Sequence, residues 1–354
     1  MKTVVAVIFG GKSSEYGVSL ESASSVLTHM DQEQFTPVMI GITKEGQWFH
    51  YEGTIKEIVA DTWYSESTCT PVAMSLCPEK HEFLVVGEER TIPFDAAFPV
   101  LHGKNGEDGT VQGLLELAGV PFVGCKVLAA ALCMDKERTH KLVAAEGFRV
   151  PMSYVLKVGQ YLEEQVEEIG AVLGFPLFVK PVKAGSSYGI SKVGKQEELA
   201  CAIQKALEYD DNVILEENIE GFEVGCAILG TDELVIGEVD EIELSEGFFD
   251  FTEKYTLQSS AIHVPARIEE ELASEIKQMS ARIYKVLGCS GLARVDSFLT
   301  PDGEIVFNEV NTLPGFTSHS RYPNMMKEIG LEFEKLISIL IKEALVEGNV
   351  LCAV

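Results

Sequence analysis

Two kinds of hydrophobic pattern alternate along this chain. Short, unbroken apolar runs at Val4–Phe9 and Ala96–Leu101 predict buried strands. Each run leads through a glycine-containing segment into a stretch of helical character, over Leu20–Leu27 and Val111–Leu117. This alternation favours the α/β fold class with α+β elements. Glycine-rich loops at the ends of such strands are also where open α/β sheets bind their ligands.

Three zones follow one another, and we expect them to form three domains. Residues 1–124 contain the elements described above. Residues 125–212 contain a strand over Leu173–Lys183, a Gly-Ser loop and a helix over Gln196–Tyr209. Residues 213–354 end in a β-hairpin and a C-terminal helix. Before that hairpin, three strands and an amphipathic helix are expected at Val213–Glu217, Glu223–Leu229, Leu234–Glu243 and Glu269–Leu287.

The hairpin expected over Gly291–Asn311 carries the most informative polar pattern. Its two β-rich runs flank Pro301–Gly303, where proline presets the backbone and glycine permits a positive φ. In antiparallel pairing about this turn, residues at equal distances from its centre face each other, and residues two apart share a side. The pairing therefore places four polar residues on one face of the hairpin: Arg294, Asp296, Glu309 and Asn311.

Two interpretations of this polar face are open. It can be a solvated outer face whose charges pair across the strands. Alternatively, its two carboxylates and one amide can hold Mg²⁺ bridged to phosphates, with Arg294 beside them to stabilise developing negative charge. The hydrophobic pattern alone does not decide between them.

Two polar loops are further candidates for ligand binding. Lys180 and Lys183 precede the turn Gly185–Ser187, whose backbone N–H groups and hydroxyls suit phosphate oxygens, although a surface loop with chance lysines is equally compatible. His102–Gly109 follows an apolar strand, and it is either a simple turn or a strand-end site for a carboxylate or an ammonium group.

Composition narrows the classes of partner. The chain has 55 acidic and 28 basic residues, for a net charge of −27, which disfavours binding to nucleic acids and to anionic membranes. No apolar run reaches the roughly 20 residues of a membrane helix. The eight cysteines form no Cys-x-x-Cys pair, which is typical of free thiols in a reducing compartment. We therefore expect a soluble, cytoplasmic protein.

In their order along the chain, these pieces resemble the ATP-grasp superfamily and, within it, the D-alanine–D-alanine ligase family. The matching stretches reach from the N-terminus to about residue 330. They are Phe9–Glu15 with Val18–Leu20, Leu101–Thr110, Met134–Lys136, Lys180–Ser187, Glu216–Glu217, Glu223, Asp250–Phe251 with Glu253–Tyr255, Arg294–Asp296, Glu309–Gly315 and Thr317–Ser320.

The resemblance implies both a fold and an activity. Residues 1–124 would form an open α/β substrate-binding domain, followed by a central (125–212) and a C-terminal (213–354) ATP-grasp subdomain, with a mobile loop at about 245–256. The activity would be formation of a dipeptide with ATP, through an acyl phosphate of D-alanine that the amine of a second D-amino acid attacks. ATP, two Mg²⁺ ions (or Mn²⁺) and a homodimer are also implied.

The resemblance also implies the roles of individual residues. The nucleotide would be held by Lys136, Lys180, Ser186, Ser187, Glu216, Glu217, Glu223 and Lys254, and the metal ions by Asp296, Glu309 and Asn311. Arg294 and the Gly315 backbone would stabilise the tetrahedral oxyanion. Glu15 would bind the ammonium group of the first substrate, with His102 nearby, and Ser320 would bind the carboxylate of the second. Glu15, Ser186 and Tyr255 would form a hydrogen-bonded trio that closes the loop over the site.

Two departures from the usual family pattern concern the second substrate. Phe249 stands where alanine-adding ligases carry Tyr, and Arg321 stands where they carry Leu or Met. Both residues resemble the D-alanine–D-serine ligases of the vancomycin-resistance type. In physical terms, a cation with five donors beside the second subsite gives a serine hydroxyl, or a water that bridges to it, a hydrogen-bond partner. An ordinary D-alanine–D-alanine ligase is the alternative, with Arg321 on the surface and Phe249 packing within its loop. A catalytically inactive nucleotide-binding module is disfavoured, because no metal ligand or phosphate lysine is missing.

Overall fold

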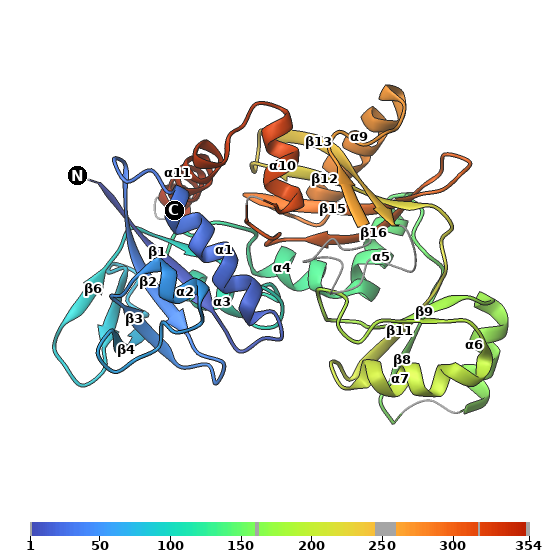
Figure 1. The fold of residues 1–354 in the computed structure, drawn as a ribbon, viewed down its shortest axis with the longest axis horizontal. Helices are drawn as coiled ribbons and strands as arrows, with labels where there is room; N and C mark the ends of the chain where they lie inside the picture. The colour runs from blue at the N-terminus through green and yellow to red at the C-terminus, as the bar shows by residue number, and fades with distance from the viewer. Residues whose placement is uncertain (1, 160–162, 245–259, 318, 352–354) are drawn as a thin grey trace.

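The computed structural model describes residues 2–159, 163–244, 260–317 and 319–351. It contains three sheets, which Figure 1 shows as separate layers with their helices. Among the described residues, no helix combines the length and the apolar character needed to cross a membrane.

The first sheet is built by the N-terminal zone and has the strand order β6-β5-β4-β3-β2-β1-β7. Its strands are β1 (Thr3–Gly10), β2 (Phe35–Ile42), β3 (Trp48–Tyr51), β4 (Cys69–Met74), β5 (Glu82–Val85), β6 (Thr91–Pro93) and β7 (Ala96–Pro99). Its helices are α1 (Tyr16–His29), α2 (Ile55–Val59) and α3 (Thr110–Leu117). The central strand β1 runs parallel to both β2 and β7. The loops after β1 and β7 therefore leave the same edge of the sheet.

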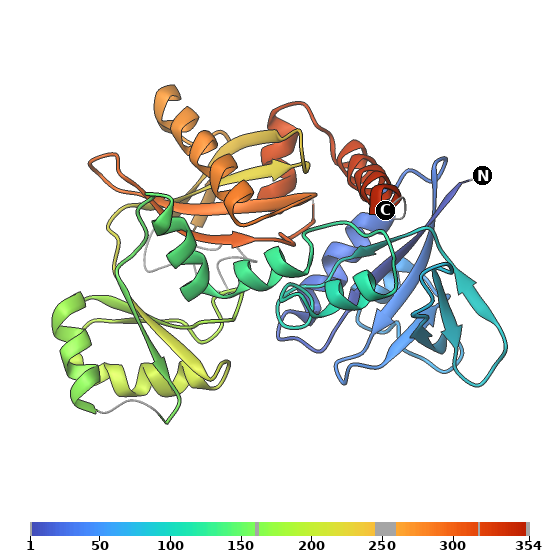
Figure 2. The same ribbon diagram turned by 180° about the vertical axis from the view of Figure 1, so that it is seen from behind.

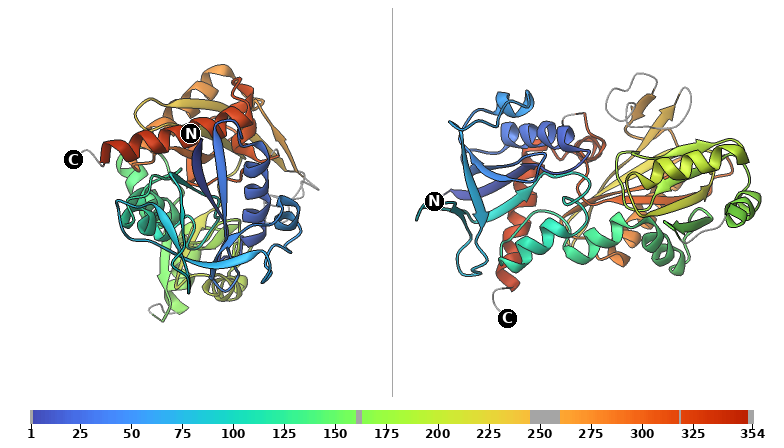
Figure 3. Two further views of the ribbon diagram at one scale, coloured as in Figure 1. Left: turned by 90° about the vertical axis from the view of Figure 1, so that its left-hand side faces the viewer. Right: turned by 90° about the horizontal axis from the view of Figure 1, so that it is seen from below.

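Alternation along β1 explains how helices cover both faces of this sheet. Val5 and Val7 pack in one core with α1, whereas Ala6 and Ile8 pack in another with α3. The C-terminal helix α11 (Phe333–Leu351) joins the first of these cores through Leu336, Ile337, Leu340 and Ile341. Figure 3 shows this helix against the N-terminal sheet, so the end of the chain completes the core of the first domain.

The second sheet has the order β10-β9-β11-β8. Its strands are β8 (Ser153–Lys157), β9 (Leu177–Pro181), β10 (Ser191–Val193) and β11 (Asn212–Glu217), and its helical segments are α6 (Glu163–Leu173), η1 (Gln196–Glu198) and α7 (Leu199–Leu207). Helices α6 and α7 contribute to one core beneath the sheet. Leu173 ends α6 instead of beginning a strand, because Gly174 follows in a left-handed conformation (φ 75°) that terminates the helix. Strand β11 pairs with β8 and β9, so it belongs to this sheet and not with the strands that follow it.

The third sheet is antiparallel, with the order β14-β13-β12-β15-β16. Its strands are β12 (Phe222–Leu229), β13 (Val235–Leu244), β14 (Ser260–His263), β15 (Leu292–Leu299) and β16 (Ile305–Asn311). Helices α4 (Val127–Met134), α5 (Lys136–Ala145) and α9 (Glu270–Val286) cover one face, and α10 (Arg321–Glu328) covers the other. Figure 2 shows α4 and α5 reaching this sheet from the N-terminal domain.

The hairpin β15–β16 has the predicted register at its polar end. Asp296 faces Glu309 and Arg294 faces Asn311, while Val295 and Val310 enter the core below α9. Nearer the turn, the pairing shifts by one residue, so Asn308 is left without a cross-strand partner in a β-bulge. The prediction of one polar face is confirmed. The predicted pairing holds for residues 294–296 with 309–311, and between the bulge and the turn each residue pairs one position away from the prediction.

Candidate active site

A first cavity lies where the loops after β1 and β7 meet the third sheet. It is lined by most of the residues expected to bind amino acids or to act in catalysis, which are Glu15, His102, Ser186, Arg294, Gly315, Ser320 and Arg321. The expected metal ligand Asn311 lines it too. Because these residues come from all three sheets or their loops, the site depends on the packing of the whole chain.

The polar face of β15–β16 is buried and densely hydrogen-bonded. Asp296 is 1% exposed and accepts hydrogen bonds from Arg294 Nε and Nη2, each at 2.7 Å, and from Asn311 Nδ2 at 2.8 Å. Glu309 lies on the same face, and its Oε2 is 3.4 Å from the Nζ of Lys136, which reaches the hairpin from helix α5. Burial of these charges excludes the solvated outer face as an interpretation of this hairpin.

The oxygen atoms on this face suit a magnesium ion. Asp296 and Glu309 are directly opposed, and Asn311 lies two residues from Glu309 on the same side. Within the described part of the chain, no cluster of three or more His, Cys, Asp or Glu side chains could hold a metal alone. In proteins, Mg²⁺ is usually bound by one or two carboxylates together with the phosphates of a substrate. The oxygens of Asp296, Glu309 and Asn311 therefore fit a metal ion that binds together with its nucleotide.

Glu15 and Ser186 meet across two domains. The Ser186 hydroxyl donates a hydrogen bond to Glu15 Oε1, and the Tyr188 hydroxyl donates to the Ser14 carbonyl at 3.0 Å. Ser186 lies in the left-handed backbone region, with a φ of 47°, which is uncommon for a residue other than glycine. Two members of the expected trio are therefore in contact. The third, Tyr255, lies outside the described residues, as do Phe249, Lys254 and the loop at 245–256.

His102 is bonded to the segment that follows β16 and carries Gly315. Its Nδ1 donates to the Leu313 carbonyl at 2.9 Å, because a carbonyl only accepts. Its Nε2 lies 3.1 Å from Ser22 Oγ, which in turn accepts the Phe316 N–H at 3.2 Å. Burial lowers the pKa of His102 to about 4, so the ring is neutral near pH 7. The described partners of His102 are thus the Leu313 carbonyl and the Ser22 hydroxyl.

His102 makes the free energy of unfolding depend on pH. Its pKa falls from 6.5 to about 4 on folding, so the unfolded chain binds more protons between these values and stability is lost as the pH falls through them. We expect the His102→Gln variant to lose about 2 kcal/mol less than the wild type between pH 7 and pH 5. Urea unfolding at both pH values measures this difference. Equal losses in the two proteins would show that His102 does not titrate in this way.

Glu107 is a buried carboxyl group that the sequence reasoning did not single out. Its Oε2 accepts the Gly103 N–H at 2.6 Å and its Oε1 accepts the Leu313 N–H at 3.3 Å. Burial, together with the charge of Glu15, raises its pKa to about 8. Its only sequence signal was its place among the glycines of the loop at His102–Gly109.

Arg321 is buried and held by carboxylates from three strands. Its Nε and Nη2 donate to the two oxygens of Asp240, each at 2.7 Å, and its Nη1 donates to Glu223 Oε1 at 2.6 Å. Asp296 Oδ1 lies 3.4 Å from Nη2. The side chain is 6% exposed, which excludes a surface arginine. A side chain on Gly225 would collide with this guanidinium, since an added Cβ would lie 2.4 Å from Nη2.

Asp240 is the second residue that the sequence reasoning missed. It is fully buried in β13, and a buried acidic residue requires a cationic or hydrogen-bonded partner. Three glutamates, Glu238, Glu241 and Glu243, stand in the same strand, so the sequence does not mark Asp240 as the residue that pairs with Arg321. The partner of Asp240 could not be deduced without the order of β13, β12 and β15.

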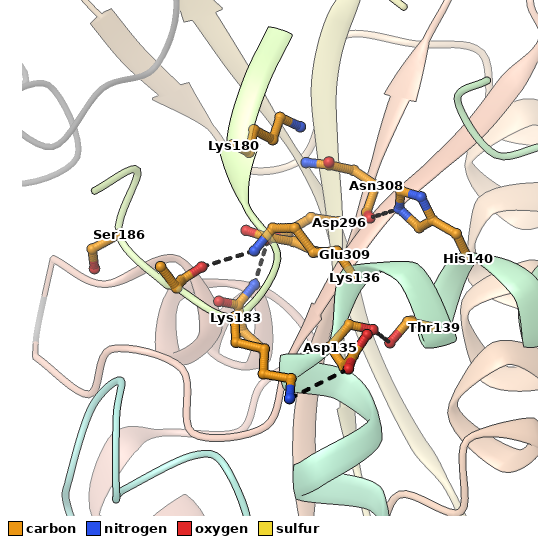
Figure 4. Close-up of polar contacts among 12 residues, drawn as sticks. Asp135, Lys136, Thr139, His140, Lys180, Lys183, Ser186, Asp296, Asn308 and Glu309 are labelled. Atoms are coloured by element: carbon orange, nitrogen blue, oxygen red, sulfur yellow. Dashed lines mark hydrogen bonds and ion pairs between the residues drawn. The ribbon is translucent and has the colours of Figure 1, made fainter. Parts of the chain in front are cut away.

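A second cavity contains most of the residues expected to bind the nucleotide. They are Lys136, Lys180, Ser187, Glu216, Glu217 and Glu223, together with Glu309. Lys180 Nζ donates to Glu216 Oε2 at 2.5 Å, and Lys136 Nζ donates to the Ala184 carbonyl at 2.8 Å. Figure 4 shows Lys136 beside Glu309. Aromatic side chains Phe178 and Phe298 complete a cavity with cationic and flat apolar surfaces.

Comparisons with known proteins agree with this arrangement. Residues 4–125 match the family model for the D-ala D-ala ligase N-terminus, and residues 142–342 match the model for the C-terminus. The vancomycin C-type resistance protein VanC1 of Enterococcus gallinarum is 44% identical over 338 residues, which cover 95% of this chain and 97% of that protein. A D-alanine–D-alanine ligase of Caldicellulosiruptor bescii is 43% identical, with 97% of this chain and 95% of that protein covered.

A solved structure provides a further comparison. The VanG D-Ala:D-Ser ligase of Enterococcus faecalis superposes with a TM-score of 0.89 and 55% sequence identity, covering 97% of this chain and 100% of that chain. The expected ATP-grasp fold is thereby confirmed. The chain belongs to the D-alanine–D-alanine ligase family, whose members are ATP-dependent ligases that form a peptide bond.

Proposed function

We propose that this chain is a D-alanine–D-serine ligase that supplies altered peptidoglycan precursors of the kind that confer vancomycin resistance. The observation that supports this most is the buried Arg321 beside Ser320 in the wall of the first cavity. The similarity to the VanG D-Ala:D-Ser ligase points in the same direction. An ordinary D-alanine–D-alanine ligase is the alternative, and the similarity to the Caldicellulosiruptor bescii enzyme favours it.

In the first step, a carboxylate oxygen of D-alanine attacks the γ-phosphorus of ATP, which gives an acyl phosphate and ADP. Lys136 and Lys180 line the second cavity and would hold the phosphates, while Glu216, Glu217 and Glu223 would contact the adenosine. Asp296, Glu309 and Asn311 would hold Mg²⁺, which neutralises phosphate charge when bound. Glu15, at the edge of the first cavity, would bind the ammonium group of D-alanine.

In the second step, the amine of D-serine attacks the acyl carbon, and phosphate leaves from the tetrahedral intermediate. Arg294 and the backbone N–H of Gly315 line the first cavity and would stabilise its oxyanion. The Gly315 segment is well held for this role, because His102, Glu107 and Ser22 all bond to the backbone of residues 313–316. Ser320 would receive the carboxylate of D-serine.

Arg321 would select serine through an N–H group directed at its hydroxyl. A guanidinium has five N–H groups, and the hydrogen bonds to Asp240 and Glu223 use three of them. Asp240 binds the guanidinium in a bidentate manner, which fixes its plane. A methionine or leucine at this position would offer D-serine no hydrogen-bond partner, so D-alanine would compete better.

The Arg321→Met variant tests this assignment. With both D-alanine and D-serine present, we expect its ratio of D-alanyl-D-serine to D-alanyl-D-alanine to fall at least ~10-fold relative to wild type. Chromatographic analysis of the products measures the ratio. Arg267→Met is the matched control. Arg267 also pairs with a carboxylate of β13, that of Glu241, but its side chain is half exposed. An unchanged ratio in Arg321→Met would remove Arg321 as the selecting residue.

A further inference from the structure

Helix α1 begins directly after Glu15, the residue proposed to bind the ammonium group of D-alanine. In the described structure, the Glu15 side chain makes no capping hydrogen bond to this helix, and its carboxylate binds Ser186 instead. Gly17, the second residue of the helix, lowers its intrinsic stability, and a Cβ added there would meet no atom within 4 Å. By its local sequence, the start of α1 is therefore weak.

Tyr16, the first residue of α1, is held by contacts outside the helix. Its hydroxyl accepts the indole N–H of Trp63 at 2.8 Å and donates to Asp61 Oδ1 at 2.9 Å. Lys44 Nζ donates to the other oxygen of Asp61 at 2.8 Å and lies 4.6 Å from the centroid of the Tyr16 ring. Burial raises the pKa of Tyr16 to about 12, so the hydroxyl keeps the proton that it donates.

The segment that holds Tyr16 is itself anchored in the core of the first domain. Figure 1 shows α2 beside α1, and both Asp61 and Trp63 follow α2 in the chain. Trp63 is 1% exposed and packs edge-on against Phe9 of β1, with 5.1 Å between the ring centroids. Asp61 lies in the left-handed backbone region (φ 53°), which aspartate adopts more readily than most residues. The start of α1 is thus tied to the core through the Tyr16 hydroxyl.

The surroundings of the Glu15 carboxylate leave little room for displacement. A Cβ added to Gly103 would lie 2.1 Å from Glu15 Oε2, and one added to Gly185 would lie 3.0 Å from the same atom. At the other end of this loop, a Cβ added to Gly10 would lie 3.1 Å from the Tyr16 ring. The loop that carries Glu15 therefore begins and ends beside the same ring, and a shift of Tyr16 would move the carboxylate within a narrow space.

We propose that Tyr16 is a positioning residue of the first amino-acid subsite, whose hydroxyl fixes the start of α1 and thereby the place of the Glu15 carboxylate. Among the described residues, Tyr16 lines neither the first nor the second cavity, so it acts through Glu15 and not by contact with a substrate. This inference rests on the proposed function, because it takes Glu15 as the group that binds the ammonium of D-alanine.

The Tyr16→Phe variant removes the hydroxyl and keeps the ring. Phosphate release is followed against the concentration of D-alanine, with ATP, Mg²⁺ and D-serine at saturation. The ammonium group of D-alanine keeps its charge throughout the reaction, so its contact with Glu15 is equally strong in the ground state and the transition state. We therefore expect the KM for D-alanine to rise ~10-fold, while kcat and the KM for D-serine change less than ~2-fold.

Tyr51→Phe is the matched control. Tyr51 is also a buried tyrosine, and its hydroxyl contacts Thr54 and Glu57, which lie in the same segment between β3 and β4 but not in α1. We expect this variant to keep the wild-type KM for D-alanine. Thermal unfolding of both variants shows whether they lose comparable stability.

Adding Gly17→Ala to Tyr16→Phe tests whether the effect passes through the start of the helix. Alanine stabilises a helix relative to glycine, so we expect the KM for D-alanine to fall ~3-fold from its raised value. Gly113→Ala in the Tyr16→Phe background is the control. It also replaces a helical glycine, where an added Cβ would meet only Val127 at 3.7 Å, and we expect it to leave the raised KM unchanged.

A wild-type KM for D-alanine in Tyr16→Phe would overturn the proposal. An equal rise in Tyr51→Phe, or no recovery with Gly17→Ala, would overturn it as well. A wild-type protein that forms no D-alanyl-D-serine would contradict the proposed function instead, and the same KM comparison would then be made with D-alanine as the sole amino acid.

Discussion

Replacing Asp296 by asparagine is expected to lower the rate of ATP-dependent ligation at least ~100-fold. Asp296 accepts hydrogen bonds from Arg294 and Asn311 through both of its oxygens, and it directly faces Glu309. Asparagine removes the negative charge that would attract Mg²⁺, and it turns an N–H₂ group toward donors. Release of phosphate with D-amino acids as substrates measures the loss.

Asp302→Asn is the matched control for this variant. Asp302 lies in the exposed turn of the same hairpin and accepts a hydrogen bond from Thr300. We expect it to retain wild-type activity. Breaking a buried ion pair also costs about 3–5 kcal/mol of stability, so rates are compared per folded molecule. Near-wild-type ligation by Asp296→Asn would contradict a metal-binding role for this face.

The second large effect is expected for Asp240→Asn. Asp240 is fully buried and binds Arg321 through both oxygens at 2.7 Å. With asparagine, the guanidinium loses one acceptor and a full negative charge, which destabilises the fold by up to about 3–5 kcal/mol. It also frees the guanidinium to tilt toward Glu223. We expect addition of D-serine to fall ~10-fold or more, with a smaller effect on addition of D-alanine.

Glu241→Gln separates this effect from a general disturbance of β13. Glu241 is the next residue on the strand, and its carboxylate binds Arg267. It therefore tests the loss of an acidic residue without affecting Arg321. Separate steady-state constants for D-serine and D-alanine, with thermal unfolding of each variant, complete the comparison. Equal losses for both amino acids in Asp240→Asn would contradict a role in selecting serine.

The parts of the site that the sequence predicted depend on local geometry. A hairpin relates residues through its turn, so the facing of Asp296 and Glu309 could be deduced. The bulge at Asn308 could not, because its contacts include a hydrogen bond from His140, which lies in a helix far away in the sequence. The carboxylates around Arg321 were also beyond prediction, since Asp240 and Glu223 come from different strands whose order depends on tertiary packing.

In the fold, too, the strands and helices could be predicted from local sequence patterns, whereas their packing against each other could not. Apolar runs located β1, β12 and β15 closely, because each strand is buried on at least one face. The C-terminal helix was also predicted, but not its packing on the first sheet. An amphipathic stripe shows that a helix has a buried face and does not identify the surface that covers it.

The products that the wild-type protein makes from a mixture of D-alanine and D-serine show which amino acid is its second substrate. The reaction contains ATP and Mg²⁺ near neutral pH, and the dipeptides are separated and quantified. We expect D-alanyl-D-serine to predominate among the products and added D-serine to accelerate phosphate release. Formation of D-alanyl-D-alanine alone would contradict the D-serine assignment and identify the chain as an ordinary D-alanine–D-alanine ligase.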